Sequence, residues 1–464
     1  MRCTVPELSM SNTRPPRKAG ANVSRRSALI GGSVAGLVLM SSVARAAPLI
    51  RRFGRARWAK EIDHAVVYRN EHEFASHPYT RGFWEIPGGG LICNFSLATA
   101  DYAAAAQGRP DLLDHTYLVT NSPGGRRGAT VRSDDYGRTW RVTSVEQGRP
   151  NNDVMIPRIG IDGRPGGLPE IGPVDFTDKN VLVTNFNHLY MQNDPLVREY
   201  YDYLKTFVEA PERHSFFRIS KDAGRTWSRS AMLPHEGLAN ISAVDSAMVR
   251  PDGRCLLFLS GSTPQGGGSS PQQQYGASGP MVYCSTEDGT DFHFLSFIAP
   301  ERNGGPPFMY PRGLALPNGR LLCILRRDRH WSAAQWTEVY FSDGGGGTWH
   351  FLSRATDFGA PSAPVLLSDG RLVLVYGRRM DPPGIRAVVS EDGGRSWSPE
   401  IIVREDAGSW DIGYPRVWEV SPGRVGTIYY YNDKDDPMYV GNDAWPPWGA
   451  GGVRYIARSI FSID

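Results

Sequence analysis

The sequence predicts an all-β fold, a six-bladed β-propeller built from four-stranded antiparallel blades. Two observations carry this prediction: a short turn sequence occurs five times, and six apolar hairpins recur along the same stretch of chain. The composition agrees, because 464 residues with 52 Gly, 35 Pro, 12 Trp and 20 Tyr make a chain rich in turns and aromatic side chains. Since no linker divides the repeats, we expect one large domain.

The recurring turn reads Ser-x-Asp-x-Gly-x-Thr/Ser-Trp. Clear copies are SDDYGRTW at 133–140, SKDAGRTW at 220–227 and SEDGGRSW at 390–397, and altered copies lie at 285–292 and 342–349. Asp accepts hydrogen bonds from nearby backbone N–H groups and Gly tolerates positive φ, so both suit a tight turn. The Trp would anchor the turn by burying roughly 150–250 Å². The spacing of 48 to 87 residues between copies fits one four-stranded blade plus its loops.

Six hairpins are the second signal, each an apolar run that follows a turn. They lie at 85–96, 178–186, 249–260, 316–327, 367–379 and 420–432. Each of the first five precedes one copy of the turn, whereas the sixth leads to the β-rich C-terminal segment 453–463. An open blade edge invites aggregation. We therefore expect residues 64–68 (HAVVY) to pair with the C-terminal segment and close the ring.

The N-terminus has the features of an export signal. Residues 24–30 (SRRSALI) carry an arginine pair, an uncharged stretch runs to Val43, and Ala44-Arg45-Ala46 has a small-x-small cleavage pattern. This arrangement resembles a twin-arginine signal peptide. We expect residues 1–46 to be that signal with a disordered N-terminal extension, and residues 47–464 to be a periplasmic or secreted propeller domain. The apolar stretch is shorter than the about 20 residues of a membrane span, so no stable anchor is expected.

Charge and cysteine usage exclude several classes. A net charge of +3 without a basic stripe does not indicate nucleic-acid binding. Four cysteines remain in the mature chain, Cys93, Cys255, Cys284 and Cys323, and most lie within predicted strands as buried apolar residues do. The ten His show no HExxH motif and no metal-ligand spacing with Cys. We expect a monomer without a metal, a cofactor or a disulfide framework.

Two segments between the repeats depart from the blade pattern. Residues 193–213 place Leu196, Tyr200, Leu204 and Phe207 at helical spacing, which predicts a helix. Residues 261–280 are dominated by Gly, Ser, Pro and Gln, which predicts a loop.

The repeated turn on a six-bladed count resembles the Asp-box, or BNR repeat, of the sialidase (neuraminidase) superfamily, from Tyr79 to the C-terminus. Asp-box propellers also occur in lyases, other glycosidases and binding proteins, so the box indicates architecture more than chemistry. The resemblance implies an exo-glycosidase that hydrolyses a terminal sialic acid or a similar carboxylated sugar. Three arginines from three blades would hold the carboxylate, a Tyr–Glu pair would supply the nucleophile, and an Asp would act as acid and base.

The resemblance assigns the substrate-binding and nucleophile positions to particular residues. Tyr414, in a Gly-Tyr-Pro element before the last hairpin, matches the nucleophile. Arg386 precedes the fifth-blade turn, and Arg81 opens the first blade ten residues before its hairpin strand. Either Arg326 or Arg327 ends the fourth-blade strand, and strand alternation lets only one of them point inward.

The acid/base and the partner of the tyrosine are less well defined. The Asp belongs on the loop after the first hairpin, where Asp101, Asp111 and Asp114 compete, and Asp101 is preferred. The Glu should come shortly before the fourth hairpin, but residues 306–312 read PPFMYPR and contain none. Glu338, later in the same blade, is the candidate substitute.

The missing Glu keeps other functions open. Further charged residues gather in the same blades, namely Arg312, Arg378, Arg379, Asp411 and Arg416. A centre rich in Arg, Asp and Tyr suits uronic acids as well as sialic acids. A polysaccharide lyase would use a Tyr or His as base beside the carboxylate, with Arg neutralising it. A non-catalytic propeller would only bind glycans; in each case the expected partner is a glycan with a sugar acid.

Overall fold

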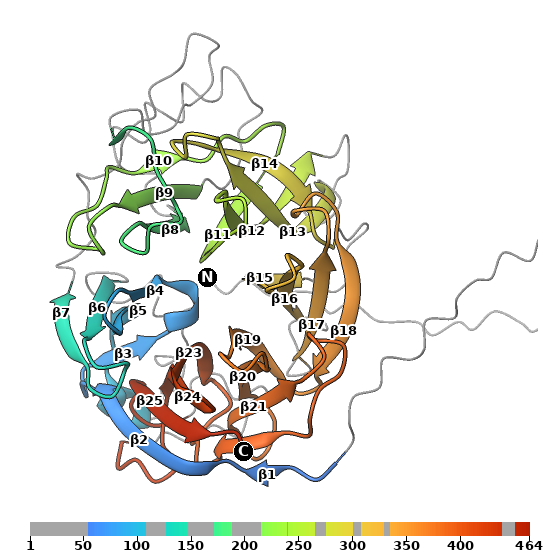
Figure 1. Ribbon diagram of the computed structural model, residues 1–464. Coiled ribbons are helices and arrows are strands. Elements are labelled where there is room, and N and C mark those ends of the chain that lie inside the picture. Colours follow the sequence, from blue (N-terminus) through green and yellow to red (C-terminus); the bar gives the residue numbers. More distant parts are fainter. Residues whose placement is uncertain are drawn as a thin grey trace, which may run out of the picture. The chain divides into compact units, whose positions relative to one another are not determined.

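A computed structural model describes residues 54–107, 127–145, 171–187, 215–238, 240–264, 275–299, 308–328, 335–438 and 451–464. The chain divides into two units, Met1–Ala47 and Pro48–Asp464, and all described residues belong to the second. The expected signal peptide at 1–46 therefore lies outside the described residues. The strands of the second unit form six sheets arranged around a common axis (Figure 1), which confirms the predicted six-bladed propeller.

The first three blades follow one another along the chain. Blade 1 contains β3 (Glu73–Ser76), β4 (Phe83–Ile86), β5 (Gly90–Thr99), β6 (Arg127–Ser133) and β7 (Arg141–Val145). Blade 2 contains β8 (Leu182–Asn187), β9 (Ser215–Ser220) and β10 (Ala231–Met232). Blade 3 contains β11 (Asn240–Val249), β12 (Cys255–Pro264), β13 (Tyr275–Ser285) and β14 (Phe292–Phe297).

The other three blades use both ends of the described chain. Blade 4 contains β15 (Phe308–Ala315), β16 (Leu321–Asp328), β17 (Gln335–Ser342) and β18 (His350–Thr356). Blade 5 contains β19 (Gly359–Leu366), β20 (Leu372–Arg378), β21 (Gly384–Ser390), β22 (Ile401–Arg404) and the short β1 (Arg57–Trp58). Blade 6 contains β23 (Gly413–Ser421), β24 (Arg424–Tyr431), β25 (Tyr455–Ser462) and β2 (Lys60–Tyr68).

The blades follow the predicted antiparallel plan with local additions. Blades 3, 4 and 6 are four-stranded. In blade 1 the innermost position is shared by β3 and β4, which pair with successive parts of β5. Blade 5 gains β1, which pairs with β22 in parallel. Each predicted hairpin supplies the second strand of a blade, so the sequence pattern located all six sheets.

The repeated turns join the third strand of a blade to its outer edge, as predicted. In the first copy Ser133 Oγ accepts the Gly137 N–H (2.8 Å), and Asp135 accepts the Thr139 N–H (2.9 Å) and hydroxyl (2.6 Å). Trp140 Nε1 donates to the Gly137 carbonyl (3.0 Å). The turn is thus closed by its own polar side chains, which explains why the same residue types recur at the same spacing.

The ends of the chain close the ring in blade 6, as the sequence predicts. β2 pairs antiparallel with β25, with Lys60 opposite Ser462 and Tyr68 opposite Ile456. His64 Nδ1 lies 2.7 Å from Ser459 Oγ across this pair. The N-terminal segment therefore supplies the outer strand of the blade whose other three strands end the chain.

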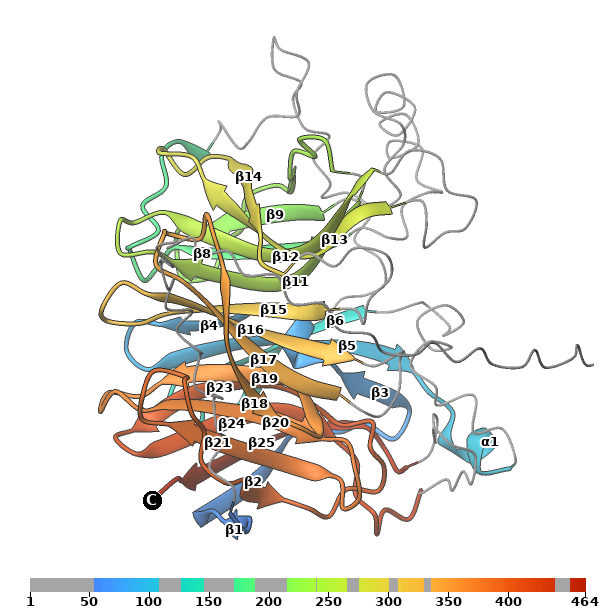
Figure 2. The same ribbon diagram turned by 90° about the vertical axis from the view of Figure 1, so that its right-hand side faces the viewer.

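Some expectations need correction. A five-residue helix, α1 (Tyr102–Ala106), follows β5 and extends from one side of the sheets (Figure 2). The expected loop at 261–280 is wrong at both ends, because β12 continues to Pro264 and β13 begins at Tyr275. The expected helix at 193–213 lies outside the described residues. Within the part of the chain that the structure describes, no helix is long and apolar enough to cross a membrane.

The core lies between neighbouring blades, where alternate residues of the strands face adjacent sheets. In blade 4, Leu322 and Ile324 pack with blade 5, whereas Cys323 and Leu325 pack with residues of blade 3. Cys93, Cys255 and Cys323 are fully buried within second strands, and burial raises the pKa of the Cys255 and Cys323 thiols. These cysteines therefore act as small apolar core residues, as predicted.

Candidate active site

The innermost strand is interrupted in every blade in which the structure describes it. In blades 3, 4, 5 and 6 the register with the second strand shifts, and in blade 1 the break between β3 and β4 holds the short 3-10 helix η1 (Pro78–Thr80). In blades 4, 5 and 6 the interruptions fall near the start of the innermost strand and the end of the second strand. Hairpin geometry places these positions at one end of the blades, opposite the repeated turns. β-bulges are over-represented beside active sites because they redirect side chains.

Two of these bulges carry the same sequence, Tyr-Pro-Arg. Tyr310 lies in the bulge of β15 and Tyr414 in that of β23, and both have positive φ, 58° and 48°. Tyrosine rarely adopts this conformation, so the surrounding structure must hold it. The two hydroxyl groups meet, with Tyr414 Oη donating to Tyr310 Oη at 3.2 Å. The tyrosines of the two Tyr-Pro-Arg sequences thus point toward one another.

Arg326 joins this tyrosine pair from the end of β16. Its Nη1 donates to Tyr414 Oη at 3.0 Å, and its guanidinium lies 5.3 Å from the centre of the Tyr310 ring. Both Arg326 and Tyr414 are 5% exposed. Burial, reinforced by Tyr414, raises the pKa of the Tyr310 hydroxyl, although the Arg326 charge opposes this. Tyr310 is therefore a protonated hydroxyl at neutral pH.

Arg379, just after β20, lies over the ring of Tyr414. Its guanidinium lies 5.0 Å from the centre of the Tyr414 ring, and Nη2 donates to Tyr430 Oη at 3.2 Å. Tyr430 in turn donates to Asp411 Oδ1 at 2.5 Å, and that oxygen lies 3.7 Å from Arg379 Nη2. Burial and the Asp411 charge raise the pKa of Tyr430 well above its usual value. Arg379 is thus held by a buried carboxylate and a neutral phenol.

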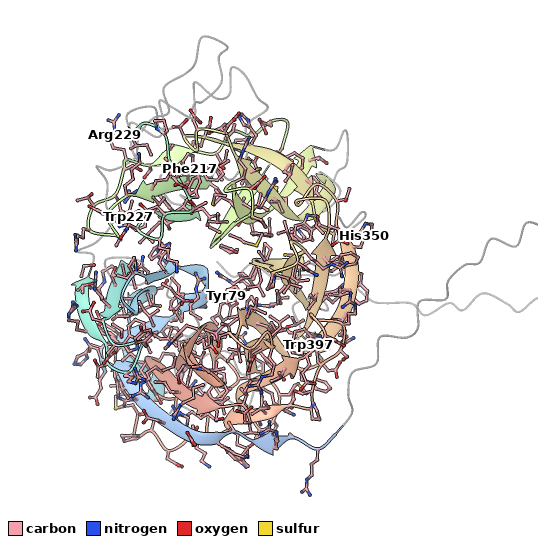
Figure 3. All side chains as sticks on the ribbon, viewed as in Figure 1. Tyr79, Phe217, Trp227, Arg229, His350 and Trp397 are labelled. Carbon is pink, nitrogen blue, oxygen red and sulfur yellow. The ribbon has the colours of Figure 1, made fainter. Side chains whose placement is uncertain are left out.

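Tyr79, in η1, lies near the centre of the ring (Figure 3). Its hydroxyl donates to the Tyr310 carbonyl at 2.8 Å, and its ring packs edge-on against those of Tyr310 and Tyr414. Two arginines fasten this segment: Arg312 donates to the Tyr79 carbonyl at 2.6 Å, and Arg416 donates to the carbonyl oxygens of Pro78 and Arg81. The arginines of both Tyr-Pro-Arg sequences therefore clamp the η1 segment.

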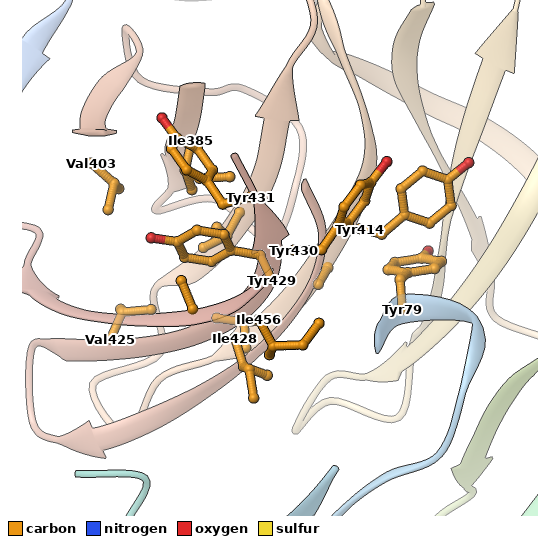
Figure 4. Close-up of a cluster of buried hydrophobic side chains, with 14 of the residues drawn as sticks. Tyr79, Ile385, Val403, Tyr414, Val425, Ile428, Tyr429, Tyr430, Tyr431 and Ile456 are labelled. Atoms are coloured by element: carbon orange, nitrogen blue, oxygen red, sulfur yellow. The ribbon is translucent and has the colours of Figure 1, made fainter. Parts of the chain in front are cut away.

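We call the set formed by Tyr79, Tyr310, Arg326, Arg379, Asp411, Tyr414 and Tyr430 the tyrosine–arginine cluster. Figure 4 shows Tyr79, Tyr414 and Tyr430 at one side of the hydrophobic core, with Tyr429 and Tyr431 directed away from them. The strand alternation of β24 explains this separation of three consecutive tyrosines. His77 borders the cluster, with its ring centre 4.8 Å from that of Tyr414.

The structure brings Tyr414 and Arg326 together, and it places Arg81 at the edge of the cluster. Arg81 Nε donates to Ser96 Oγ at 3.1 Å, while its backbone carbonyl is bound by Arg416. Arg327 points to the other side of β16, so only one of the two neighbouring arginines faces the cluster, as strand alternation requires.

Glu338 lies with Arg327 instead of Tyr414. Its carboxylate accepts from Trp336 Nε1 at 2.8 Å and from the Tyr340 hydroxyl at 3.2 Å, and it lies 3.5 Å from Arg327. Glu338 pairs with Leu325, so it shares the face of blade 4 opposite to Arg326. The hydroxyl of Tyr310, and not a carboxylate of Glu338, lies beside the Tyr414 hydroxyl at 3.2 Å.

Arg386 and Asp101 are also placed away from the tyrosine pair. Arg386, on the third strand of blade 5, pairs with Glu405 at 2.8 Å and donates to the Arg404 carbonyl. Asp101 is exposed and caps α1 by accepting the Ala104 N–H at 2.9 Å. Its two competitors, Asp111 and Asp114, lie outside the described residues. Blade 5 instead contributes Arg379 to the cluster.

Sequence reasoning assigned no role to Tyr79, Tyr310 or Tyr430. The repeated Tyr-Pro-Arg could have identified Tyr310, because each copy begins six residues before a predicted hairpin, at 316–327 and at 420–432. Nothing comparable marks Tyr430, which stands among three tyrosines of one strand. Only its contacts with Arg379 and Asp411 in the folded protein distinguish Tyr430 from its neighbours.

The cluster can hold an anion and move a proton. Two guanidinium groups lie within contact of one phenol, and arginine binds carboxylates through a planar fork of donors. A hydrogen bond donated to a phenol oxygen favours its deprotonated form. No group of three or more His, Cys, Asp and Glu side chains suited to a metal ion occurs among the described residues.

A six-bladed propeller with these repeated turns at one end of its blades is a BNR-type propeller. A family model described as a BNR repeat-like domain matches residues 185–427, more than half of the chain. The chain therefore belongs to the BNR repeat-like domain family. A search of curated protein sequences found no match.

Solved structures share the fold at low sequence identity. A Dyadobacter fermentans protein of unknown function has a TM-score of 0.56 and 20% identity over 87% of this chain and 99% of that one. The leech intramolecular trans-sialidase, complexed with 2,7-anhydro-Neu5Ac, has a TM-score of 0.52 and 12% identity over 88% of this chain and 70% of that one. Trypanosoma rangeli sialidase has a TM-score of 0.50 and 12% identity over 87% of this chain, which spans only 60% of the length of that protein. These similarities establish the propeller fold.

Proposed function

We propose that this chain is a glycosidase of the sialidase type, which hydrolyses a terminal carboxylated sugar from glycans. The observation that carries the proposal is the 3.0 Å hydrogen bond from Arg326 to the hydroxyl of Tyr414. This bond brings Arg326, a group that would bind a carboxylate, into contact with Tyr414, the candidate nucleophile. Membership of the BNR repeat-like domain family and the sialidase-like fold support the same class.

The substrate carboxylate would be bound by Arg326 and Arg379. In a sialic acid the carboxylate is attached to the anomeric carbon, so a group that binds it also positions the carbon that reacts. Arg326 contacts the Tyr414 hydroxyl and Arg379 lies over the Tyr414 ring. A carboxylate between these arginines would place the anomeric carbon next to the phenol oxygen. Arg81, at the edge of the cluster, would be the third arginine.

Tyr414 would attack the anomeric carbon and form a covalent intermediate, as tyrosine does in sialidases. Arg326 donates to the Tyr414 hydroxyl, and the hydroxyl of Tyr310 would serve beside it in place of the carboxylate that the resemblance implies. The acid that protonates the leaving group would come from the segment after β5. Asp101, Asp111 and Asp114 remain the candidates for that role.

The proposal includes the cellular setting expected from the N-terminus. An export signal at 1–46 would deliver a monomeric mature chain of residues 47–464 to the periplasm or the medium, where glycans are accessible. N-terminal sequencing of the exported protein tests the cleavage site near Ala47.

Product analysis tests the hydrolysis. The mature chain should release free sugar acid from sialosides, seen by mass spectrometry as a gain of one water across the products, and Tyr414→Phe should abolish release while retaining the thermal transition. Saturable binding of sialosides without any product would favour a glycan-binding propeller. Full turnover by Tyr414→Phe would remove Tyr414 from the mechanism.

A further inference from the structure

We propose that the Tyr310–Tyr414 pair also cleaves 4-linked uronic acid residues by β-elimination, with Tyr414 as the base and Tyr310 as the acid. This inference shares with the proposed function the binding of a carboxylate by Arg326 and Arg379 and the use of the Tyr414 hydroxyl, which acts here as a base and not as a nucleophile. Its substrate is an internal uronate in place of a terminal sugar acid, and its product carries a carbon–carbon double bond in place of added water.

The position of the second hydroxyl is the reason for the inference. A retaining glycosidase needs its proton donor on the far side of the sugar from the nucleophile, about 5–5.5 Å away for paired carboxylates. In this structure the second hydroxyl lies directly beside the first, with 3.2 Å between Tyr310 Oη and Tyr414 Oη. Two adjacent hydroxyls on one side of a sugar suit the removal and the delivery of a proton at neighbouring carbon atoms.

The environments of the two hydroxyls differ in the sense that the reaction requires. Tyr414 Oη accepts a hydrogen bond from the Arg326 guanidinium at 3.0 Å, so a positively charged donor faces the oxygen that would take the C5 proton. Tyr310 is partly buried beside the Tyr414 phenol, and desolvation raises its pKa, so it keeps the proton needed in an acid. The arginine contact therefore assigns the base to Tyr414 and leaves the role of acid to Tyr310.

The elimination balances within the pair. Tyr414 phenolate takes the proton from C5, the C5–H electrons form the C4=C5 double bond, and the C4–O bond breaks. Tyr310 gives its proton to the departing glycosidic oxygen, so Tyr414 ends as the phenol and Tyr310 as the phenolate. A proton moves from Tyr414 to Tyr310 along their existing hydrogen bond, and the starting state returns.

The arginines would make the C5 proton removable. Loss of this proton places negative charge on the carboxylate attached to C5, and buried guanidinium groups stabilise charge that develops there. Arg326 reaches the base itself, and Arg379 lies against the ring of the same tyrosine. A carboxylate held by these arginines brings C5 to Tyr414.

The backbone holds the pair in place. Both tyrosines have positive φ in bulges of equivalent register, and Tyr79 Oη fixes the Tyr310 carbonyl at 2.8 Å. The Arg312 guanidinium in turn donates to the backbone carbonyl of Tyr79 at 2.6 Å, which holds Tyr79 in place. Strained backbone maintained in this way is typical of preorganised sites.

The same geometry predicts which uronates react. Both hydroxyls act from one side, so the C5–H and C4–O bonds must lie on the same face of the ring. This holds for glucuronate and mannuronate, whereas the two bonds lie on opposite faces in galacturonate and guluronate. We expect cleavage of 4-linked glucuronan and polymannuronate, and little cleavage of polygalacturonate or polyguluronate.

The test incubates the mature chain with these four polymers and with sialosides, and follows ultraviolet absorbance of the unsaturated product together with mass. We expect an absorbing product without added water from glucuronan or polymannuronate, at a rate at least about 10-fold above the other two polymers. Absence of such a product from both, or products that carry an added water, would overturn the elimination. Sialoside hydrolysis in the same experiment reports on the proposed function separately.

Variants test the separate roles of the two hydroxyls. Tyr310→Phe should lower the elimination rate about 100-fold, the size of effect expected for loss of a general acid. It should still exchange the C5 proton for deuterium in D2O, because Tyr414 remains. Tyr414→Phe should abolish both the elimination and the exchange. Full elimination by Tyr310→Phe would contradict its role.

A matched control is Tyr283→Phe, which removes a buried tyrosine hydroxyl bound to the Pro234 carbonyl in blade 3. It should leave the elimination and the exchange at the wild-type rates. Loss of exchange in Tyr310→Phe would show that this substitution disrupts the base as well, and would also contradict the separate role assigned to Tyr310.

Discussion

The hydroxyl groups of Tyr310 and Tyr414 lie 3.2 Å apart although the two residues belong to blades 4 and 6. Each follows the same course, a bulge with positive φ that leads through Pro to an inward-packed Arg. The propeller therefore brings two copies of one local structure face to face at its axis. The two copies form a hydrogen-bonded pair, and Arg326 donates to the Tyr414 member of that pair at 3.0 Å.

Arg326→Lys should lower kcat/KM on a carboxylated substrate by about 100-fold, because lysine cannot reproduce the fork of donors or reach the Tyr414 hydroxyl in the same way. Arg327→Lys is the matched control, since Arg327 follows directly in β16 but faces Glu338. It should retain activity within about twofold. Equal losses in both variants, measured by initial rates, would contradict the assignment of Arg326.

Arg379→Lys should lower activity by a similar factor, whereas Arg386→Lys should not. Both residues lie in blade 5 and are 2% exposed, but Arg379 contacts the Tyr414 ring and Arg386 pairs with Glu405. Kinetics of the two variants decide which arginine serves the site. Thermal unfolding must accompany them, because Arg386→Lys weakens a buried ion pair and should reduce stability.

Tyr79→Phe should reduce kcat about tenfold while KM changes little. The substitution removes the hydrogen bond from Tyr79 Oη to the Tyr310 carbonyl, and one such bond contributes up to about 1.4 kcal/mol, which corresponds to a factor of about ten. Tyr79 is a positioning residue in this argument, so binding should survive while the alignment of Tyr310 is lost. A change in KM alone would place Tyr79 in substrate binding instead.

The repeated turns should contribute stability that depends on pH. Hydrogen bonds from the Thr226 side chain and backbone lower the pKa of Asp222 to about 2 in the folded protein, below the unfolded value of about 3.9. The carboxylate thus stabilises the fold above about pH 4, and this contribution disappears as pH falls toward about 2. The difference in melting temperature between wild type and Asp222→Asn should shrink over that range. A difference independent of pH would contradict this origin.

A chain that begins at Asn70 should lose the closure of the ring. It lacks β1 and β2, so the edge of β25 would be open to other molecules, and exposed edges promote aggregation. We expect a lower melting temperature and oligomers in size-exclusion chromatography, whereas a chain that begins at Pro48 should behave as wild type. Equal stability of the two chains would show that the β2–β25 pair is dispensable.

The architecture could be predicted because its determinants are local. Ser133, Asp135, Gly137 and Trp140 satisfy one another within eight residues, and the Ser and Asp bonds recur in the other clear copies, although Trp397 donates to Ser353 of blade 4. Closure of the ring was predictable too, since one apolar strand remained at each end of the repeats. The packing of the cysteines followed from their place within these strands.

The candidate site was only partly predictable, because its contacts join distant blades. Strand alternation explains why one of Arg326 and Arg327 faces the cluster, but the sequence favoured neither. Arg386 was selected over Arg379 from its distance to a repeated turn, although the end of β20 is what reaches the axis. Asp101 caps a helix that the all-β pattern did not contain.

The sequence by itself determined the six blades, their turns and the pairing of the two ends, because each depends on residues close together in the chain or on one leftover strand edge. Only the tertiary structure decided that Tyr310 is the partner of Tyr414 and that Glu338 is not. The reason is physical: a bulge reverses the usual direction of a side chain, and ring closure determines which bulges meet. Neither effect can be read from residue spacing along one strand.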